Sequence, residues 1–174
     1  QDVMMNIKIS ALEFAEEVKT GNISVEDFVG KTLEQIQNLD SKLHAFLSVN
    51  DDALNQAREI DKKIKSGDDV GACFGMPISI KDNMCIQGSK TTCASKMLEN
   101  FVAPYDATVI SKVKKEGGII IGMANMDEFA CGGSGETSAF GPTQNPNAFG
   151  LITGGSSSGS ASAVGADFCD MALG

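Results

Sequence analysis

Histidine and paired cysteines are scarce in this sequence, and both shortages limit the chemistry that it can support. The 174 residues include one histidine, His44, in an apolar stretch far from the glycine-rich loops. We expect His44 to be structural, which excludes a Ser-His-Asp triad. The five cysteines form an odd set without a C-x-x-C pair. This argues against a disulfide framework and a zinc site, so we expect no metal and a reducing, cytoplasmic location.

Long apolar runs and basic runs are also absent. No window approaches about 18 uninterrupted apolar residues, so we expect no membrane span. The net charge is -9, from 14 basic and 23 acidic residues. Phosphate contacts need a positive face, so this composition argues against direct binding of nucleic acid. Any nucleic acid would have to be held by another subunit or another region.

The first third of the sequence has helical patterning. Ser10 and Glu13 form a capping box that opens the first predicted helix. Ser24 caps a second helix, and a third is predicted over residues 51–65. Residues 43–49 form a short β-like segment between the second and third helices.

The pattern changes after residue 71. Residues 76–80 and 117–123 are apolar runs of strand length, and residues 108–116 between them are predicted to be helical. Helices alternating with buried strands are typical of an α/β fold. Residues 131–160 are rich in Gly, Ser, Thr, Asn and Pro, which indicates a working surface.

Two segments combine residues suited to catalysis. Lys81 ends an apolar run, where burial would make its ammonium lose a proton more easily and act as a general base. The plainer alternative is a strand-end lysine that reaches water. The run GGSSSGS (154–160) precedes an alanine-rich segment and concentrates hydroxyl groups. Together they suggest a serine hydrolase that uses lysine in place of histidine.

The glycine–serine run has other interpretations. It could be a flexible linker, or a loop that binds phosphate at a helix N-terminus, although it lacks the lysine of a P-loop. Asp127 and Glu128 could each supply a carboxylate to the site. Acidic residues of this kind are more often charges at a helix N-terminus or on the surface. Candidates for lining a small polar pocket, where glycine allows close backbone approach, are Gly132, Gly133, Ser134, Gly154 and Gly155.

Two motifs at a fixed interval resemble the amidase signature family. They are GMPISIKDN (75–83) and GGSSSGS (154–160), with 75 residues between Lys81 and Ser156. This interval, together with the apolar run before Lys81, leads us to expect that Lys81 is buried and within hydrogen-bond reach of Ser156.

Two further segments resemble one branch of this family. NMDEFA (125–130) and TSAFGPTQNP (137–146) are similar to the glutaminase subunits of the aspartyl/glutamyl-tRNA amidotransferases. Ser158 replaces a common glycine and Thr153 a common proline, and both leave Ser156 in place.

The resemblance implies an amidase-signature fold, with a mixed β-sheet core covered by helices on both faces. Lys81 would be the base and Ser156, after a cis peptide bond, the serine that relays the proton. The acylated serine and the oxyanion hole would lie beyond Gly174. Residues 1–174 would then be the N-terminal portion of a single amidase domain, helical over 8–66 and α/β over 71–174, and inactive alone.

The implied activity is hydrolysis of glutamine to supply ammonia. Partners would be GatB-like and GatC-like subunits, with tRNA held indirectly and no membrane. ATP and Mg²⁺ would act in the B subunit, and this chain would need no cofactor. The alternatives are a free-standing amidase acting on a small or fatty amide, and a nucleotide- or anion-binding module built on the Gly/Ser loop.

Overall fold

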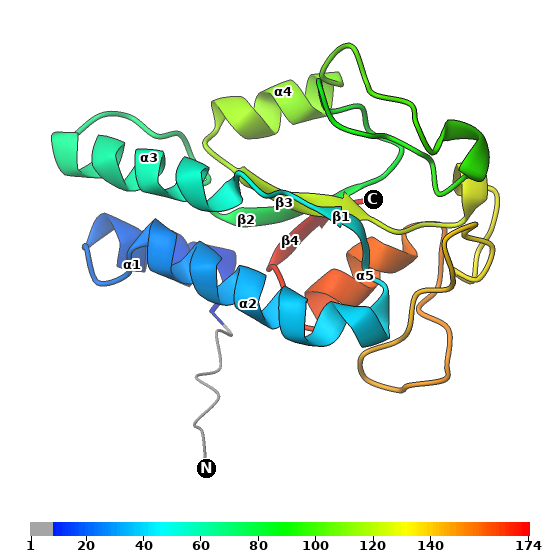
Figure 1. Cartoon of the computed structure of the whole chain (residues 1–174). Helices are drawn as coiled ribbons and strands as arrows, with labels where there is room; N and C mark the ends of the chain where they lie inside the picture. Colours follow the sequence, from blue (N-terminus) through cyan, green and yellow to red (C-terminus); the bar gives the residue numbers. More distant parts are fainter. Residues whose placement is uncertain (1–8) are drawn as a thin grey trace.

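The computed structural model describes residues 9–174, so residues 1–8 of the predicted domain, including the start of its helical part at residue 8, lie outside the described residues. In chain order, the helices and strands are α1 (Ala11–Lys19), α2 (Val25–Leu43), β1 (Phe46–Val49), α3 (Ala53–Ser66), β2 (Pro77–Lys81), η1 (Lys96–Leu98), α4 (Thr108–Lys115), β3 (Ile119–Ala124), η2 (Glu128–Ala130), α5 (Ser158–Gly165) and β4 (Met171–Leu173). Helix α4 lies on one side of the sheet, and α1, α2 and α5 lie on the other (Figure 1). The predicted α/β class is confirmed.

The four strands have the order β1-β3-β2-β4. β1 pairs antiparallel with β3, whereas β3 and β4 both pair parallel with β2. Every residue of β2 and β3 is buried. Mostly apolar runs suit strands that are covered on both faces, which is why both were predicted. β4 was not predicted, because three residues are too few to show a pattern.

The N-terminal helices follow their predicted caps, with one correction. The Ser10 hydroxyl and the Glu13 carboxylate form the predicted capping box of α1. The segment 43–49 was expected to be β-like throughout, but α2 continues to Leu43 and the strand begins at Phe46. The carboxylate of Asp40 accepts a hydrogen bond from the Ala45 N–H at 2.8 Å, which ends the helix there and frees the chain to extend.

The start of α2 is capped from α3. The carboxylate of Asp61 accepts hydrogen bonds from the Ser24 hydroxyl (2.8 Å) and from the N–H groups of Val25 and Glu26 (2.9 Å each). Two N–H groups that have no partner within α2 are thereby satisfied, and two helices far apart in sequence are joined.

Replacing Asp61 by alanine should therefore lower the free energy of unfolding of the whole protein by about 1–3 kcal/mol, because it leaves these donors unpaired. Chemical denaturation measures this loss. Asp68→Ala, in the exposed turn after α3, is the matched control and should change stability by less than about 0.5 kcal/mol. Equal effects for the two variants would contradict the cap.

Candidate active site

Lys81 is the last residue of β2 and one of the buried charged residues of this chain. Its neighbours β3 and β4 leave it only 5% exposed. Its ammonium donates hydrogen bonds to the hydroxyls of Ser156 at 2.7 Å and Ser157 at 2.8 Å. The predicted burial and the predicted contact with Ser156 are confirmed. The alternative of a lysine that reaches open water is wrong.

Two opposing effects act on the proton of Lys81. Burial lowers the pKa of its ammonium below the ordinary value of a lysine, and the negative charge of Asp127 works in the opposite direction. The lowered pKa lets Lys81 give up its proton closer to neutral pH than an exposed lysine does. A neutral amine held against a hydroxyl is a competent general base.

The two serines lie in the turn that leads into α5. The peptide bond that precedes Ser156 is cis. The Ser156 carbonyl accepts a hydrogen bond from the Asp127 N–H at 3.1 Å, and the Gly159 N–H donates to the Asn125 carbonyl at 2.9 Å. The serine turn is thus attached to the chain just after β3, beside the end of β2 that carries Lys81.

The three serines within α5 bond to the surrounding structure. The hydroxyls of Ser158, Ser160 and Ser162 make hydrogen bonds, at 3.0, 3.0 and 2.9 Å respectively, to the Thr143 hydroxyl and to the carbonyls of Leu173 and Gln144. The density of hydroxyls in this segment therefore has two causes. The first two serines meet Lys81, and the later ones attach α5 to the loops and to β4.

The predicted pocket glycines are partly brought together. A Cβ on Gly155 would lie 2.9 Å from the Gly135 nitrogen and 3.1 Å from the Gly133 carbonyl carbon, so glycine permits this close approach. Gly132 packs on the carboxylate of Asp127 in the same way. Gly154 has a positive φ of +83° beside open space. Contact of these residues with a substrate stays a prediction.

Ser134 also belongs to this loop, and its hydroxyl accepts a hydrogen bond from the Glu136 N–H at 3.4 Å. This bond is local, so it shapes the turn in which Gly133 and Gly135 lie.

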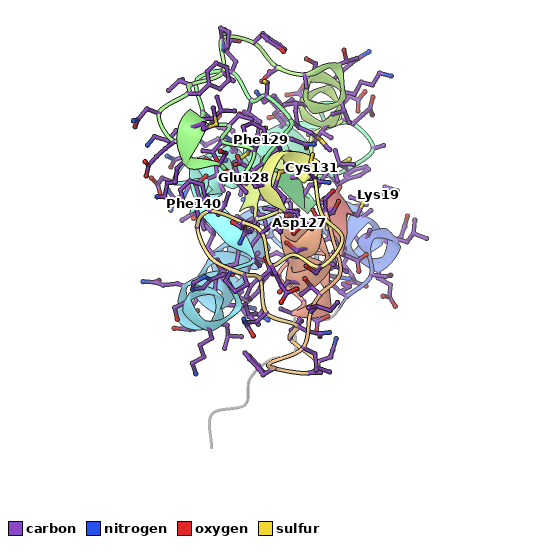
Figure 2. All side chains as sticks on the ribbon, turned by 90° about the vertical axis from the view of Figure 1, so that its right-hand side faces the viewer. Lys19, Asp127, Glu128, Phe129, Cys131 and Phe140 are labelled. Carbon is purple, nitrogen blue, oxygen red and sulfur yellow. The ribbon has the colours of Figure 1, made fainter. Side chains whose placement is uncertain are left out.

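Asp127 is the functional candidate whose environment the sequence did not indicate. It lies at a helix N-terminus, as one of its two expected places had it, because it directly precedes η2; the other, a place on the surface, is wrong, since its side chain is fully buried. The carboxylate accepts hydrogen bonds from the Gly135 N–H (3.0 and 3.1 Å), the Thr137 N–H (3.2 Å) and the Thr137 hydroxyl (2.8 Å). Figure 2 looks onto this end of the sheet, where Asp127, Glu128 and Cys131 follow β3.

The protonation of Asp127 follows from these contacts. Desolvation would raise the pKa of its carboxyl, but the Thr137 hydroxyl and the N–H groups of Thr137, Gly135 and Ser134 outweigh it. The net pKa lies below the ordinary value of an aspartate, so Asp127 is a buried anion at neutral pH. The only signal in the sequence for this buried carboxylate was the position of Asp127, a few residues before a Gly/Ser-rich loop.

The expectation that His44 lies far from the glycine-rich loops is wrong. A Cβ on Gly141 would lie 3.3 Å from the His44 ring nitrogen Nδ1. The His44 carbonyl accepts hydrogen bonds from the Asn125 side-chain amide (3.1 Å) and the Thr143 hydroxyl (3.3 Å). His44 ends α2 with a φ of 53°, and this turn brings it against residues that are remote in sequence.

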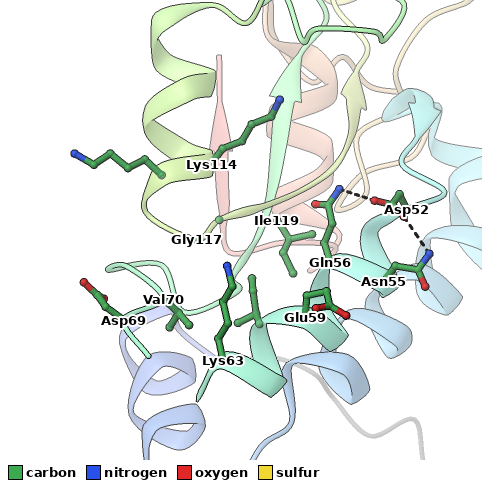
Figure 3. Close-up of a pocket in the computed structure, with 13 residues that line it drawn as sticks. Asp52, Asn55, Gln56, Glu59, Lys63, Asp69, Val70, Lys114, Gly117 and Ile119 are labelled. Atoms are coloured by element: carbon green, nitrogen blue, oxygen red, sulfur yellow. Dashed lines mark hydrogen bonds between the residues drawn. The ribbon is translucent and has the colours of Figure 1, made fainter. Parts of the chain in front are cut away.

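A large cavity lies elsewhere, between α3 and α4. Its volume is about 570 Å³, and its lining includes Asp52, Glu59, Lys63 and Lys114 (Figure 3). Its lining reaches Ile119, where β3 begins, whereas Lys81 and the serines lie at the carboxyl end of β2. Ligands of α/β sheets bind at the carboxyl ends of parallel strands, so Lys81, and not this cavity, marks the candidate active site.

Within residues 9–174, no three side chains of His, Cys, Asp or Glu are grouped as a metal site would need. No helix in the same range combines the length and the apolar character that crossing a membrane requires.

Comparisons with known proteins agree with this geometry. The family model described as Amidase matches residues 27–174. The A subunit of the glutamyl-tRNA(Gln) amidotransferase of Prochlorococcus marinus is 50% identical over 163 residues, which are 93% of this chain and 34% of that protein. The chain thus spans about a third of the length of the curated relatives that it matches.

Solved structures give the same picture. The crystal structure of the glutamyl-tRNA(Gln) amidotransferase A subunit from Thermotoga maritima is 37% identical, with a TM-score of 0.74 over 97% of this chain and 34% of that one. The peptide amidase of Stenotrophomonas maltophilia is 28% identical, with a TM-score of 0.88 over 95% of this chain and 35% of that one. These similarities also bear out the fold expected from the two motifs.

Proposed function

The chain belongs to the amidase family, and we propose on this basis that it is part of the glutamine-hydrolysing subunit of a glutamyl-tRNA(Gln) or aspartyl-tRNA(Asn) amidotransferase. The observation that carries the chemistry is the 2.7 Å contact between the buried Lys81 amine and the Ser156 hydroxyl. The choice of glutamine rests on the similarity to the A subunits of glutamyl-tRNA(Gln) amidotransferases.

The reaction would proceed through a relay of protons. Neutral Lys81 takes the proton of Ser156, and Ser156 takes that of a third hydroxyl, from a serine further along the whole protein. That oxygen attacks the carboxamide carbon of glutamine. The proton returns through Ser156 to the leaving nitrogen, which departs as ammonia and leaves a glutamyl ester. Water, activated by the same relay, then releases glutamate.

The pocket would be built from the glycine-rich segments around this relay. Gly133 and Gly155 lie close together next to Ser156, since a Cβ on Gly155 would lie 3.1 Å from the Gly133 carbonyl carbon, and both residues are exposed, so their main chain would form one side of the pocket. We assign Gly132, Ser134 and Gly154 to the same wall.

The rest of the assembly follows from the same proposal. Ammonia would pass to a B subunit, which uses ATP and Mg²⁺ to activate the misacylated tRNA, and a C subunit would complete a cytoplasmic heterotrimer. The net charge of -9 supports this division of labour, because an acidic chain is poorly suited to hold tRNA itself.

Two other functions fit the site less well. A free-standing amidase is favoured by the closer structural overlay with the peptide amidase. The higher sequence identity to the amidotransferase A subunits, together with the segments that flank Asp127, favours the amidotransferase. An anion-binding module would need free N–H groups at the start of α5. The N–H of Gly159, in the first turn of this helix, is already bonded to the Asn125 carbonyl, which argues against this alternative.

Ammonia release tests this proposal directly. The whole protein, purified with its B and C subunits, should hydrolyse glutamine with a kcat/KM at least about a hundredfold above that for acetamide or a peptide amide, because the enzyme would be selective for one substrate. A preference for peptide amides would select the free-standing amidase. Absence of hydrolysis of any amide would contradict both.

A further inference from the structure

We propose that Asp127 is a positioning residue of this site: it holds the 134–137 loop and Ser156 in register and supplies the negative charge that balances Lys81. The inference rests on the proposed function, because it assigns a role within the same reaction. It concerns a carboxylate that takes no part in the relay of Lys81 and Ser156.

Asp127 lies between the 134–137 loop and the turn that contains Ser156. Its carboxylate accepts the hydrogen bonds of Gly135 and Thr137, and its N–H donates to the Ser156 carbonyl at 3.1 Å. A Cβ on Gly155 would collide with the same carboxylate. One residue therefore contacts both the loop and the serine turn, the latter through its main-chain N–H and through the packing of its carboxylate on Gly155, so displacing its side chain would shift the residue that precedes Ser156.

The neighbouring acidic side chains are occupied elsewhere. The carboxylate of Asp82 accepts hydrogen bonds from Thr92 and from the Ala94 N–H, and that of Glu128 accepts from the Ser95 hydroxyl at 2.6 Å. The elements that contact β2, namely β3, β4 and α5, contain no ionisable residue, and neither does β1, which pairs with β3. Asp127 is the opposite charge that acts on Lys81.

The sign of this effect is defined. The anion of Asp127 raises the pKa of Lys81 against the effect of burial, which lowers it. Removing the anion should lower the pKa further, so that Lys81 becomes neutral at a lower pH. The rate of a reaction that needs neutral Lys81 rises with pH through this pKa, and that rise should therefore move to lower pH.

The test uses Asp127→Asn in the whole protein with its partner subunits, and the pH dependence of kcat/KM for glutamine. Asparagine keeps the size of the side chain but loses the charge and turns an amide towards the donors of Gly135 and Thr137. We expect kcat/KM at the optimum to fall by about tenfold or more, and its acidic limb to shift to lower pH.

Three matched variants separate the two roles. Asp127→Glu keeps the charge but displaces the loop, so kcat/KM should fall while the acidic limb stays. Thr137→Val removes one bond to Asp127 and should lower kcat/KM a few-fold with the limb unmoved. Glu128→Gln removes a neighbouring charge that is bonded to Ser95, and it should also leave the limb in place.

A direct titration keeps the inference testable without turnover. The ¹³Cε resonance of Lys81, identified by its absence in Lys81→Arg, should titrate at a lower pH in Asp127→Asn than in the wild type. An unchanged midpoint, together with kcat/KM within about twofold of the wild type, would overturn the proposal, even if the variant melts at a lower temperature. A wild-type protein that hydrolyses no amide would refute the proposed function. The titration midpoint of Lys81 in Asp127→Asn would still test the effect of Asp127 on Lys81.

Discussion

Replacing Lys81 by alanine should reduce the turnover of glutamine by the whole protein by at least about a thousandfold. The amine contacts the Ser156 hydroxyl at 2.7 Å and the Ser157 hydroxyl at 2.8 Å, and no other base is bonded to either hydroxyl among residues 9–174. Without it, Ser156 has no group to which it can pass a proton. Members of such a relay act as a unit, so the loss of one removes most of the catalysis.

Two variants show whether the proton or only the positive charge matters. Arginine stays protonated at every pH of interest, so Lys81→Arg should be nearly as inactive as Lys81→Ala if Lys81 is the base. Lys62→Ala, at an exposed lysine of α3 that pairs with Glu59 at 2.6 Å, should keep full activity. Steady-state kinetics of the three variants decide the point. A loss of less than about tenfold in Lys81→Ala would mean that another group is the base.

The parts of the fold that could be predicted share one property, which is a local pattern. Lys81 ends a mostly apolar run, and such a run indicates a strand that is buried on both faces. The spacing of Ser10 and Glu13, which is that of a capping box, is enough to predict the start of a helix. The resemblance to the amidase signature family added the pairing of Lys81 with Ser156, which no local pattern contains.

The features that could not be predicted depend on contacts between distant segments. An aspartate with the sequence neighbours of Asp127 is usually found at the surface. Asp127 is a buried anion only because the 132–137 loop folds over it. His44 was assigned to a strand because nothing in its neighbourhood showed that Asp40 would end the helix. The three residues of β4 form a strand only because β2 offers them an edge.

The glycine at position 159 provides the second large expected effect. Gly159 lies in the first turn of α5 with helical backbone geometry, and alanine is favoured over glycine within a helix by about 1 kcal/mol. Helix propensity alone would therefore predict that Gly159→Ala stabilises the protein. Packing predicts the opposite, because the added Cβ would fall on the Ala45 carbonyl oxygen and on the main chain of Asn125.

A collision with main-chain atoms cannot be relieved by a change of rotamer, so the first turn of α5 must move away from β1 and β3. Ser156 and Ser157 precede this turn and would move with it, out of reach of Lys81. Because displacing a reacting group by about 1 Å can cost a hundredfold in rate, we expect turnover of glutamine to fall by about a hundredfold or more. The free energy of unfolding should fall by about 1–3 kcal/mol.

The matched control is Gly30→Ala in the middle of α2, where the added Cβ would meet only Leu54 Cδ1 at an ordinary 3.7 Å. Helix propensity should prevail at this position, with a gain in the free energy of unfolding of about 0.5–1 kcal/mol and unchanged turnover. Denaturation curves and glutaminase rates of the two variants give the comparison. If Gly159→Ala and Gly30→Ala stabilised the protein equally and Gly159→Ala stayed fully active, the start of α5 would be able to shift without moving Ser156. The close contact of α5 with Asn125 would then not be what positions this serine.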